Sequence, residues 1–230
     1  MRTHRRKLLL AGAATSAAPG AGMGAAVRAS RRGRPQGRIV WRLLWLLAAV
    51  ALGLGSAWGV LRSVSGYGAS AGPWRASTLA GSPDADLYTR ARVALGGLLA
   101  LNREETMYFV AATDSAGAPL RSRCSYRVSG VPPQARWWSV TAYADDLFLF
   151  PNPQRRYSVN GASAPLDAQG RFALLSGPTS PVGAQTLPWL PTPGDRGLMF
   201  TLRVYNPDPA LAAAPGTLQA PRIELLGDCR

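Results

Sequence analysis

Histidine is almost absent from this sequence, whose single copy is His4 near the N-terminus. A Ser-His-Asp triad, a Cys-His pair and a His-ligated zinc, copper or iron site are therefore excluded from the rest of the chain. Neither a Walker loop nor a GxGxxG motif occurs, so phosphoryl transfer and nicotinamide chemistry have no support. We expect no metal site, no cofactor and no catalytic assignment.

Acidic residues are missing from the first third of the chain. No Asp or Glu precedes Asp84, whereas ten Lys and Arg residues lie between Arg2 and Arg42. From Arg62 onward the chain holds 16 basic and 12 acidic residues, so most of the formal net charge of +14 belongs to the N-terminal segment. This asymmetry indicates membrane topology and gives no sign of a nucleic-acid partner.

An apolar run of 23 residues, from Ile39 to Leu61, follows the basic residues. As a helix it spans roughly 34 Å, enough to cross a hydrocarbon core of about 30 Å. Because basic flanks stay on the cytoplasmic side, we predict one transmembrane helix at 39–61 in the inner (cytoplasmic) membrane. A disordered cytoplasmic tail at 1–38 would precede it, and residues 62–230 would be periplasmic or otherwise extracytoplasmic.

Two alternatives to this topology stay open. Gly55-Ser56-Ala57 offers small residues for cleavage, so the run also fits a secretory signal, although it is longer than a usual signal core. Translation from Met23 instead of Met1 would keep the basic residues between Arg28 and Arg38. In every version residues 62–230 are exported.

Cysteine is also scarce, with Cys124 and Cys229 as the two copies. Both fall in the exported part, where an oxidising compartment favours a disulfide. Closing a loop of about 100 residues would contribute about 3–5 kcal/mol. Two free thiols and an intermolecular bridge are the alternatives.

The exported part divides at Gly81 and Asn102. Residues 62–81 are rich in Gly and Ser without a sustained period, and we expect a linker there. Ser82, Pro83 and the acids of the next turn favour the start of an amphipathic helix over 82–102. An exported domain is therefore expected over 82–230.

After Asn102 the apolar period becomes alternating, with Pro- and Gly-rich turns between short segments. We predict an all-β, jelly-roll-like antiparallel β-sandwich over 106–228. The predicted strands are Thr106–Thr113, Arg123–Ser129, Arg136–Tyr143, Leu147–Phe150, Arg156–Val159, Arg171–Leu175, Gly197–Tyr205 and Arg222–Leu226.

Two of these strands predict which side chains face the core. Alternation puts Leu198, Phe200, Leu202 and Val204 on one face of Gly197–Tyr205, and Trp138, Val140 and Ala142 on one face of Arg136–Tyr143. The opposite faces carry aromatic, hydroxyl and guanidinium groups. We expect these faces to form either a binding groove or a platform beneath the 82–102 helix, and we favour the platform slightly.

An aromatic and basic set forms the candidate binding site. Tyr and Trp rings stack on sugar rings, and Arg binds carboxylate or phosphate with two parallel hydrogen bonds. Packing within the sandwich is the alternative explanation for the same residues. The candidates are Trp137, Tyr143, Arg156, Tyr157, Trp189, Arg203 and Tyr205.

Carboxylates occur in three neighbouring pairs: Asp84 with Asp86, Glu104-Glu105 and Asp145-Asp146. Paired carboxylates serve glycoside hydrolysis or calcium binding. Neighbours on a strand point to opposite faces, however, so adjacency alone does not place them across a substrate. We expect helix-start chemistry for the first pair and solvated turns or an Arg partner for the others, with calcium at Asp145-Asp146 left open.

Several segments together resemble the bacterial domain-of-unknown-function family 1214. They are Trp137–Tyr143, Asn152, Arg156–Ser158, Trp189–Pro191 and Phe200–Tyr205, in this order and spacing. The resemblance extends over about Leu79 to Leu226 and implies a jelly-roll-like β fold. In this family the domain stands alone behind an N-terminal membrane segment or follows a second domain, family 1254. The chain resembles the short, membrane-anchored form, and the family brings no established activity or catalytic residues.

These observations predict a membrane-anchored envelope protein that acts as a non-enzymatic binding or assembly module. Its partners would be the membrane, through a single span, and a glycan, a lipid headgroup or an envelope protein. The alternative is a His-independent, carbohydrate-active enzyme that uses paired carboxylates.

Overall fold

The computed structural model describes residues 36–62, 68–95, 100–180, 186–227 and 229. The expected tail at 1–38 therefore lies almost wholly outside the described residues. The chain separates into two units, which we treat individually.

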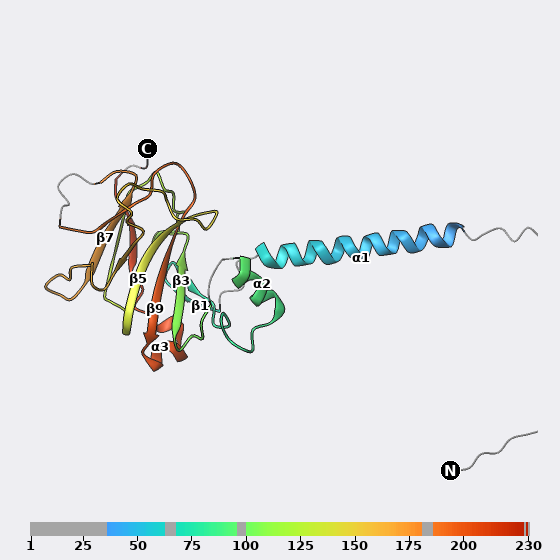
Figure 1. The fold of residues 1–230 in the computed structure, drawn as a ribbon, viewed down its shortest axis with the longest axis horizontal. Helices are drawn as coiled ribbons and strands as arrows, with labels where there is room; N and C mark the ends of the chain where they lie inside the picture. Colours follow the sequence, from blue (N-terminus) through green and yellow to red (C-terminus); the bar gives the residue numbers. More distant parts are fainter. Residues whose placement is uncertain (1–35, 63–67, 96–99, 181–185, 228, 230) are drawn as a thin grey trace, which may run out of the picture. The chain divides into compact units, whose positions relative to one another are not determined.

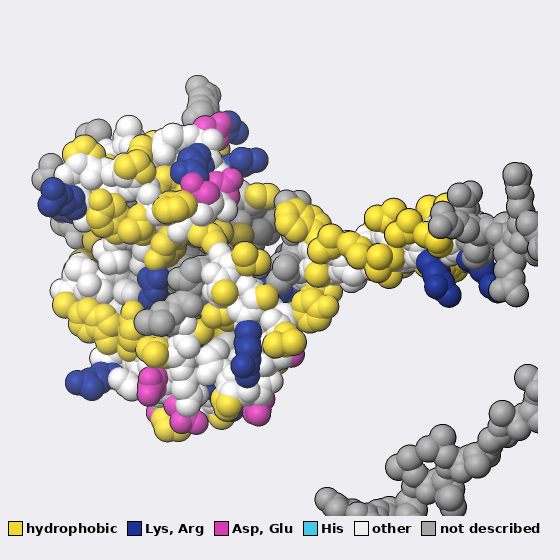
Figure 2. All heavy atoms as spheres, turned by 45° about the vertical axis from the view of Figure 1, so that its right-hand side comes forward, with side chains coloured by type: hydrophobic (Ala, Val, Ile, Leu, Met, Phe, Trp, Pro, Cys, Tyr) yellow, Lys and Arg dark blue, Asp and Glu magenta, His cyan; other side chains and the backbone are white. Residues whose placement is uncertain are grey.

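One long helix, α1 (Gln36–Arg62), begins in the N-terminal unit and continues into the second unit. The stretch Gly37–Val60 is long and apolar enough to cross a membrane, and none of it is buried in protein. Figure 2 shows apolar side chains along α1 and basic side chains near its N-terminal end. The sequence has Arg38 and Arg42 in this part of the helix. A signal sequence has the same length and composition, so the helix fits both an anchor and a signal.

The β domain holds two sheets, formed by short strands that end at Pro- and Gly-containing turns (Figure 1). The large sheet has the order β1-β2-β3-β9-β5-β6, with β1 Ala69–Ala71, β2 Trp74–Ala76, β3 Thr106–Ala111, β5 Ala135–Ala144, β6 Ser158–Asn160 and β9 Leu198–Pro207. The small sheet has the order β10-β4-β7-β8, with β4 Tyr126–Gly130, β7 Phe172–Gly177, β8 Trp189–Pro191 and β10 Arg222–Leu225.

Short helices complete the domain. They are α2 (Leu87–Leu95), α3 (Pro209–Ala213) and the 3-10 turn Pro215–Thr217. Asp208 caps α3 through its Oδ1, which accepts a hydrogen bond from the Ala210 N–H, and Pro209 takes the first helical position.

The two sheets face each other across one apolar core. Trp138 of the large sheet stacks near Phe172 of the small one, with ring centroids 4.4 Å apart, and Phe200 meets Tyr126 edge to face at 6.4 Å. Leu202 and Val204 are fully buried, and the aliphatic faces predicted for β5 and β9 are thus confirmed as core. The prediction of a mostly β domain behind one apolar helix is confirmed as well.

Three details of the predicted fold were wrong. Strands β7 and β8 are parallel, so the sandwich is not purely antiparallel. Residues Leu147–Phe150 form no strand, because they follow a tight turn and contribute one isolated bridge, from Leu149 to Tyr143. The expected linker contains β1 and β2, which extend the large sheet to one edge.

The helix predicted over 82–102 is shorter in the described residues. It begins after Asp86, whose Oδ1 accepts hydrogen bonds from the N–H groups of Tyr88 and Thr89, so Asp86 caps the helix instead of Ser82. The threonine hydroxyl and the two N–H groups lower the pKa of the Asp86 carboxyl. No residue of α2 is buried, and residues 96–99 lie outside the described part of the chain.

Candidate functional site

Four of the predicted binding residues share one surface of the large sheet. The register places Trp137 of β5 opposite Tyr205 of β9, and Tyr143 lies diagonally from Arg203. We call this surface, turned away from the core, the outer face. Its members in β2, β3, β5, β6 and β9 are Arg75, Thr106, Tyr108, Val110, Trp137, Ser139, Thr141, Tyr143, Ser158, Asn160, Met199, Thr201, Arg203 and Tyr205.

Arg203 lies at the centre of the outer face and is held in one orientation. Its guanidinium donates one hydrogen bond to Thr141 Oγ1 at 2.9 Å and another to the Tyr143 hydroxyl at 2.6 Å. The guanidinium carbon lies 5.5 Å from the centroid of the Tyr143 ring, within cation–π range. The side chain is half-buried, so a planar cation is presented on the sheet with little freedom to move.

Tyr108 shows that the aromatic residues around Arg203 form one electrostatic group. Its pKa is raised, chiefly by burial and then by the neighbouring phenols of Tyr205 and Tyr143, while the positive charge of Arg203 acts in the opposite direction. Neither Tyr108 nor Thr141 was among the predicted site residues. The alternation of β3 and β5 was the signal that would have found them, since both positions fall on the face opposite the core.

Helix α2 does not pack over the outer face, as the platform prediction required. Trp137 is 41% exposed, and α2 buries none of its residues. The platform that the sequence favoured slightly is therefore not found in the described residues. The exposure of Trp137 favours the open version at that position, whereas Thr141 and Thr201 of the same face are buried.

Arg156 and Trp189 lie elsewhere, in a pocket of about 410 Å³ where β6 and β8, the edge strands of the two sheets, come together. The Trp189 indole N–H donates to the Gly177 carbonyl at 3.2 Å, and the Asn152 side chain holds the backbone of Arg156 from both sides. The predicted set thus divides into two places. Tyr157 is 36% exposed in the loop before β6 and lines neither.

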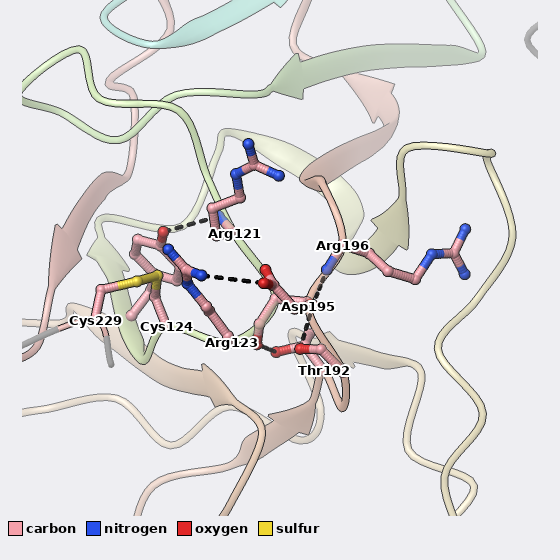
Figure 3. Close-up of a disulfide and its surroundings, with 10 residues drawn as sticks. Arg121, Arg123, Cys124, Thr192, Asp195, Arg196 and Cys229 are labelled. Carbon is pink, nitrogen blue, oxygen red and sulfur yellow. Dashed lines mark hydrogen bonds and ion pairs between the residues drawn. A yellow bond between two sulfur atoms is a disulfide. The ribbon is translucent and has the colours of Figure 1, made fainter.

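The two cysteines are joined in a disulfide, Cys124–Cys229, which confirms that prediction and ties the start of β4 to the C-terminal residues. Figure 3 shows Arg123 beside it, pointing toward Asp195, with which it forms an ion pair at 3.0 Å. The fully buried Ser122 and Thr192 connect the same two loops, because the Thr192 hydroxyl donates to the Ser122 carbonyl.

The Asp145-Asp146 pair has a basic partner. Arg196 bridges Asp146 at 2.5 Å and Asp145 at 3.4 Å, and its hydrogen bond is the main reason that the pKa of Asp146 is lowered. The same contact raises the pKa of Arg196. In the part of the chain that the structure describes, no three acidic, Cys or His side chains come together as a metal site would require.

Comparison with protein families finds a match for the central part of this domain. Residues 105–209, from the start of β3 to the end of β9, match the model described as protein of unknown function (DUF1214). This segment is DUF1214-like. The resemblance drawn from the sequence is thereby confirmed over these residues. Most of the outer face, including Arg203 and its partners Thr141 and Tyr143, lies inside the DUF1214 segment.

Two solved structures are similar to the chain. The VPA0106 protein from Vibrio parahaemolyticus is 24% identical, with a TM-score of 0.52 over 63% of this chain and 36% of its own. An uncharacterized protein from Burkholderia cenocepacia is 17% identical, with a TM-score of 0.38 over 53% of this chain and 29% of its own. The chain thus spans about a third of the length of these proteins, and the first of them shares its fold. No curated protein matches the chain.

Proposed function

We propose that this protein is a membrane-anchored envelope protein whose β domain is a binding or assembly module and not an enzyme. In this proposal α1 is the anchor in the inner membrane, the N-terminus is cytoplasmic, and the DUF1214 domain with its jelly-roll-like fold is periplasmic. The outer face is the binding surface. The partners it would serve are a glycan, a lipid headgroup or an envelope protein.

The observation that carries the proposal is the arrangement around Arg203. A half-buried guanidinium, held by two hydroxyls and surrounded by phenol and indole rings, is built for recognition. The competing hypothesis, hydrolysis by paired carboxylates, receives less support. Asp145 and Asp146 are engaged by Arg196, and Asp86 caps a helix.

The exposed Trp137 provides the test. We expect Trp137→Ala in the full chain, purified in detergent, to weaken binding to a ligand found on glycan and lipid arrays by at least tenfold, or about 1.4 kcal/mol. The melting temperature should change little, because the indole is 41% exposed. Leu166→Ala, at a side chain that is 56% exposed and outside the outer face, is the matched control.

Two results would overturn this proposal. One is unchanged ligand binding by Trp137→Ala at wild-type stability. The other is the appearance of hydrolysis products when the protein is incubated with a bound glycan, together with their loss in Asp145→Asn or Glu105→Gln variants. That second pattern would establish the carboxylate enzyme in its place.

A further inference from the structure

Arg203 differs in its charge environment from the arginines of the described β domain that pair with a carboxylate. Arg123, Arg196 and Arg222 each form an ion pair with a carboxylate, and the side chains in these pairs are between 38% and 66% exposed. Arg203 is half-buried, as Arg196 is, but among the described residues its hydrogen-bond partners are two neutral hydroxyls. A partly desolvated cation that has no counter-ion among the described residues is well placed to bind an external anion.

The outer face supplies no such anion. None of the outward strand positions from β2 to β6 across the large sheet carries Asp or Glu. The second cation of the face, Arg75, is exposed on β2. The surface is therefore electrostatically complementary to a negative group.

We propose that the outer face binds an acidic sugar, a hexose-type ring carrying a carboxylate or a phosphate, with Arg203 as the anion-binding residue. This inference rests on the proposed function and narrows its ligand. The bonds to Thr141 and Tyr143 leave other N–H groups of the guanidinium free to donate to the anion.

The rings around Arg203 argue for a sugar instead of a bare ion. Trp137 and Tyr205 face each other across β5 and β9, and they offer an indole face and a phenol beside the guanidinium. Aromatic faces stack against the C–H surface of a pyranose, and phenol hydroxyls bond to its hydroxyl groups. An acidic sugar occurs both in free glycans and in lipid headgroups, and the experiment separates these two sources.

The test uses the full chain and two pairs of probes. The first pair is a glucuronic-acid tetrasaccharide and the same tetrasaccharide with its carboxyl groups reduced to alcohols. The second pair is nanodiscs containing phosphatidylinositol and nanodiscs of phosphatidylcholine alone. We expect at least one acidic probe to bind, with its uncharged or sugar-free counterpart at least tenfold weaker. Preference for the tetrasaccharide indicates a free glycan, and preference for phosphatidylinositol indicates a headgroup.

Variants distinguish specific anion binding by Arg203 from a general effect of positive charge on the face. Arg203→Gln should lower the affinity for the acidic probe at least tenfold. Arg203→Lys should lower this affinity less, because it keeps the charge, and Arg75→Gln should leave it nearly unchanged. If Arg203→Gln fails to fold, Tyr143→Phe replaces it, since that change releases the guanidinium and should reduce the preference for the acidic probe.

Equal binding of the charged and uncharged probes, or equal weakening by Arg203→Gln and Arg75→Gln, would overturn the acidic-sugar inference. Absence of binding by both acidic probes would overturn it as well. The proposed function is judged separately, because the Trp137→Ala comparison uses whichever ligand the arrays reveal.

Discussion

Leu147 adopts a backbone conformation that suits glycine. Its φ is +70°, and it closes the tight turn after β5, where the Leu147 N–H donates to the Ala144 carbonyl and the Ala144 N–H donates to the Phe148 carbonyl. A three-residue hairpin loop often needs a left-handed residue at this position, and glycine fills it without steric cost. Leucine therefore carries local strain of roughly 1–2 kcal/mol.

Relief of this strain gives a residue-scale prediction. Leu147→Gly should raise the free energy of unfolding by roughly 0.5–1 kcal/mol, because the lost strain exceeds the added entropy of the unfolded chain. Leu149→Gly is the matched control, since both side chains are 40% exposed and Leu149 has no positive φ. Chemical denaturation of the full chain measures both variants. A Leu147→Gly protein that is no more stable than Leu149→Gly would contradict the argument.

At the scale of single elements, the alternation of apolar and polar residues in the sequence was enough to predict the long central strands. It was not enough to predict the short strands. Strands β5 and β9 have ten residues each, long enough for their alternating aliphatic side chains to identify the core face from the sequence. Burial itself does not alternate strictly, because Thr141 and Thr201 of the opposite face are buried as well. Strands β1 and β2 have three residues each, too few to show a period within a Gly- and Ser-rich segment. Their place at the sheet edge depends on pairing with β3, which is a long-range contact.

The candidate site followed the same division. The four residues on β5 and β9 could be brought together from strand parity, because their register follows from which face is apolar. Arg156 and Trp189 meet in the edge pocket through the packing of two sheets, and no local pattern encodes that meeting. Strand β8 was missed altogether, since it follows Pro188, ends in Pro191 after only three residues and pairs in parallel with β7.

Trp74 of the unexpected hairpin provides the element-scale prediction. It is fully buried, and its indole N–H donates to the Pro221 carbonyl at 2.7 Å, which connects the edge of the large sheet to the segment before β10. Trp74→Ala should lower the free energy of unfolding by about 3–5 kcal/mol through the cavity and the orphaned carbonyl. Trp137→Ala, on the opposite face of the same sheet and 41% exposed, should cost much less. If thermal denaturation showed the same loss of stability for Trp74→Ala and Trp137→Ala, then β1 and β2 would not form a packed edge of the sheet.

At the scale of the whole molecule, the distribution of charge and apolar residues supports the proposed placement of each part in a compartment. Basic residues precede α1, no acidic residue occurs before Asp84, and the disulfide Cys124–Cys229 belongs to the β domain. A cytoplasm keeps thiols reduced, whereas an oxidising compartment preserves such a bridge. The charge rule and the disulfide therefore support the same orientation on independent physical grounds.

This orientation leads to the last prediction. Alkaline phosphatase fused after Arg230 should be active, and a fluorescent protein that folds only in the cytoplasm should stay dark at the same position. Replacing Arg31, Arg32, Arg34 and Arg38 by Glu should reduce phosphatase activity, because it removes the charge that holds the N-terminus inside. Thr3→Glu, which adds one acid far from α1, is the control. A fusion of full-length size in the membrane fraction supports an anchor, whereas a smaller soluble product supports signal cleavage near Ala57. Fluorescence of the cytoplasmic reporter after Arg230 would place the β domain inside the cell and remove the basis for an envelope function.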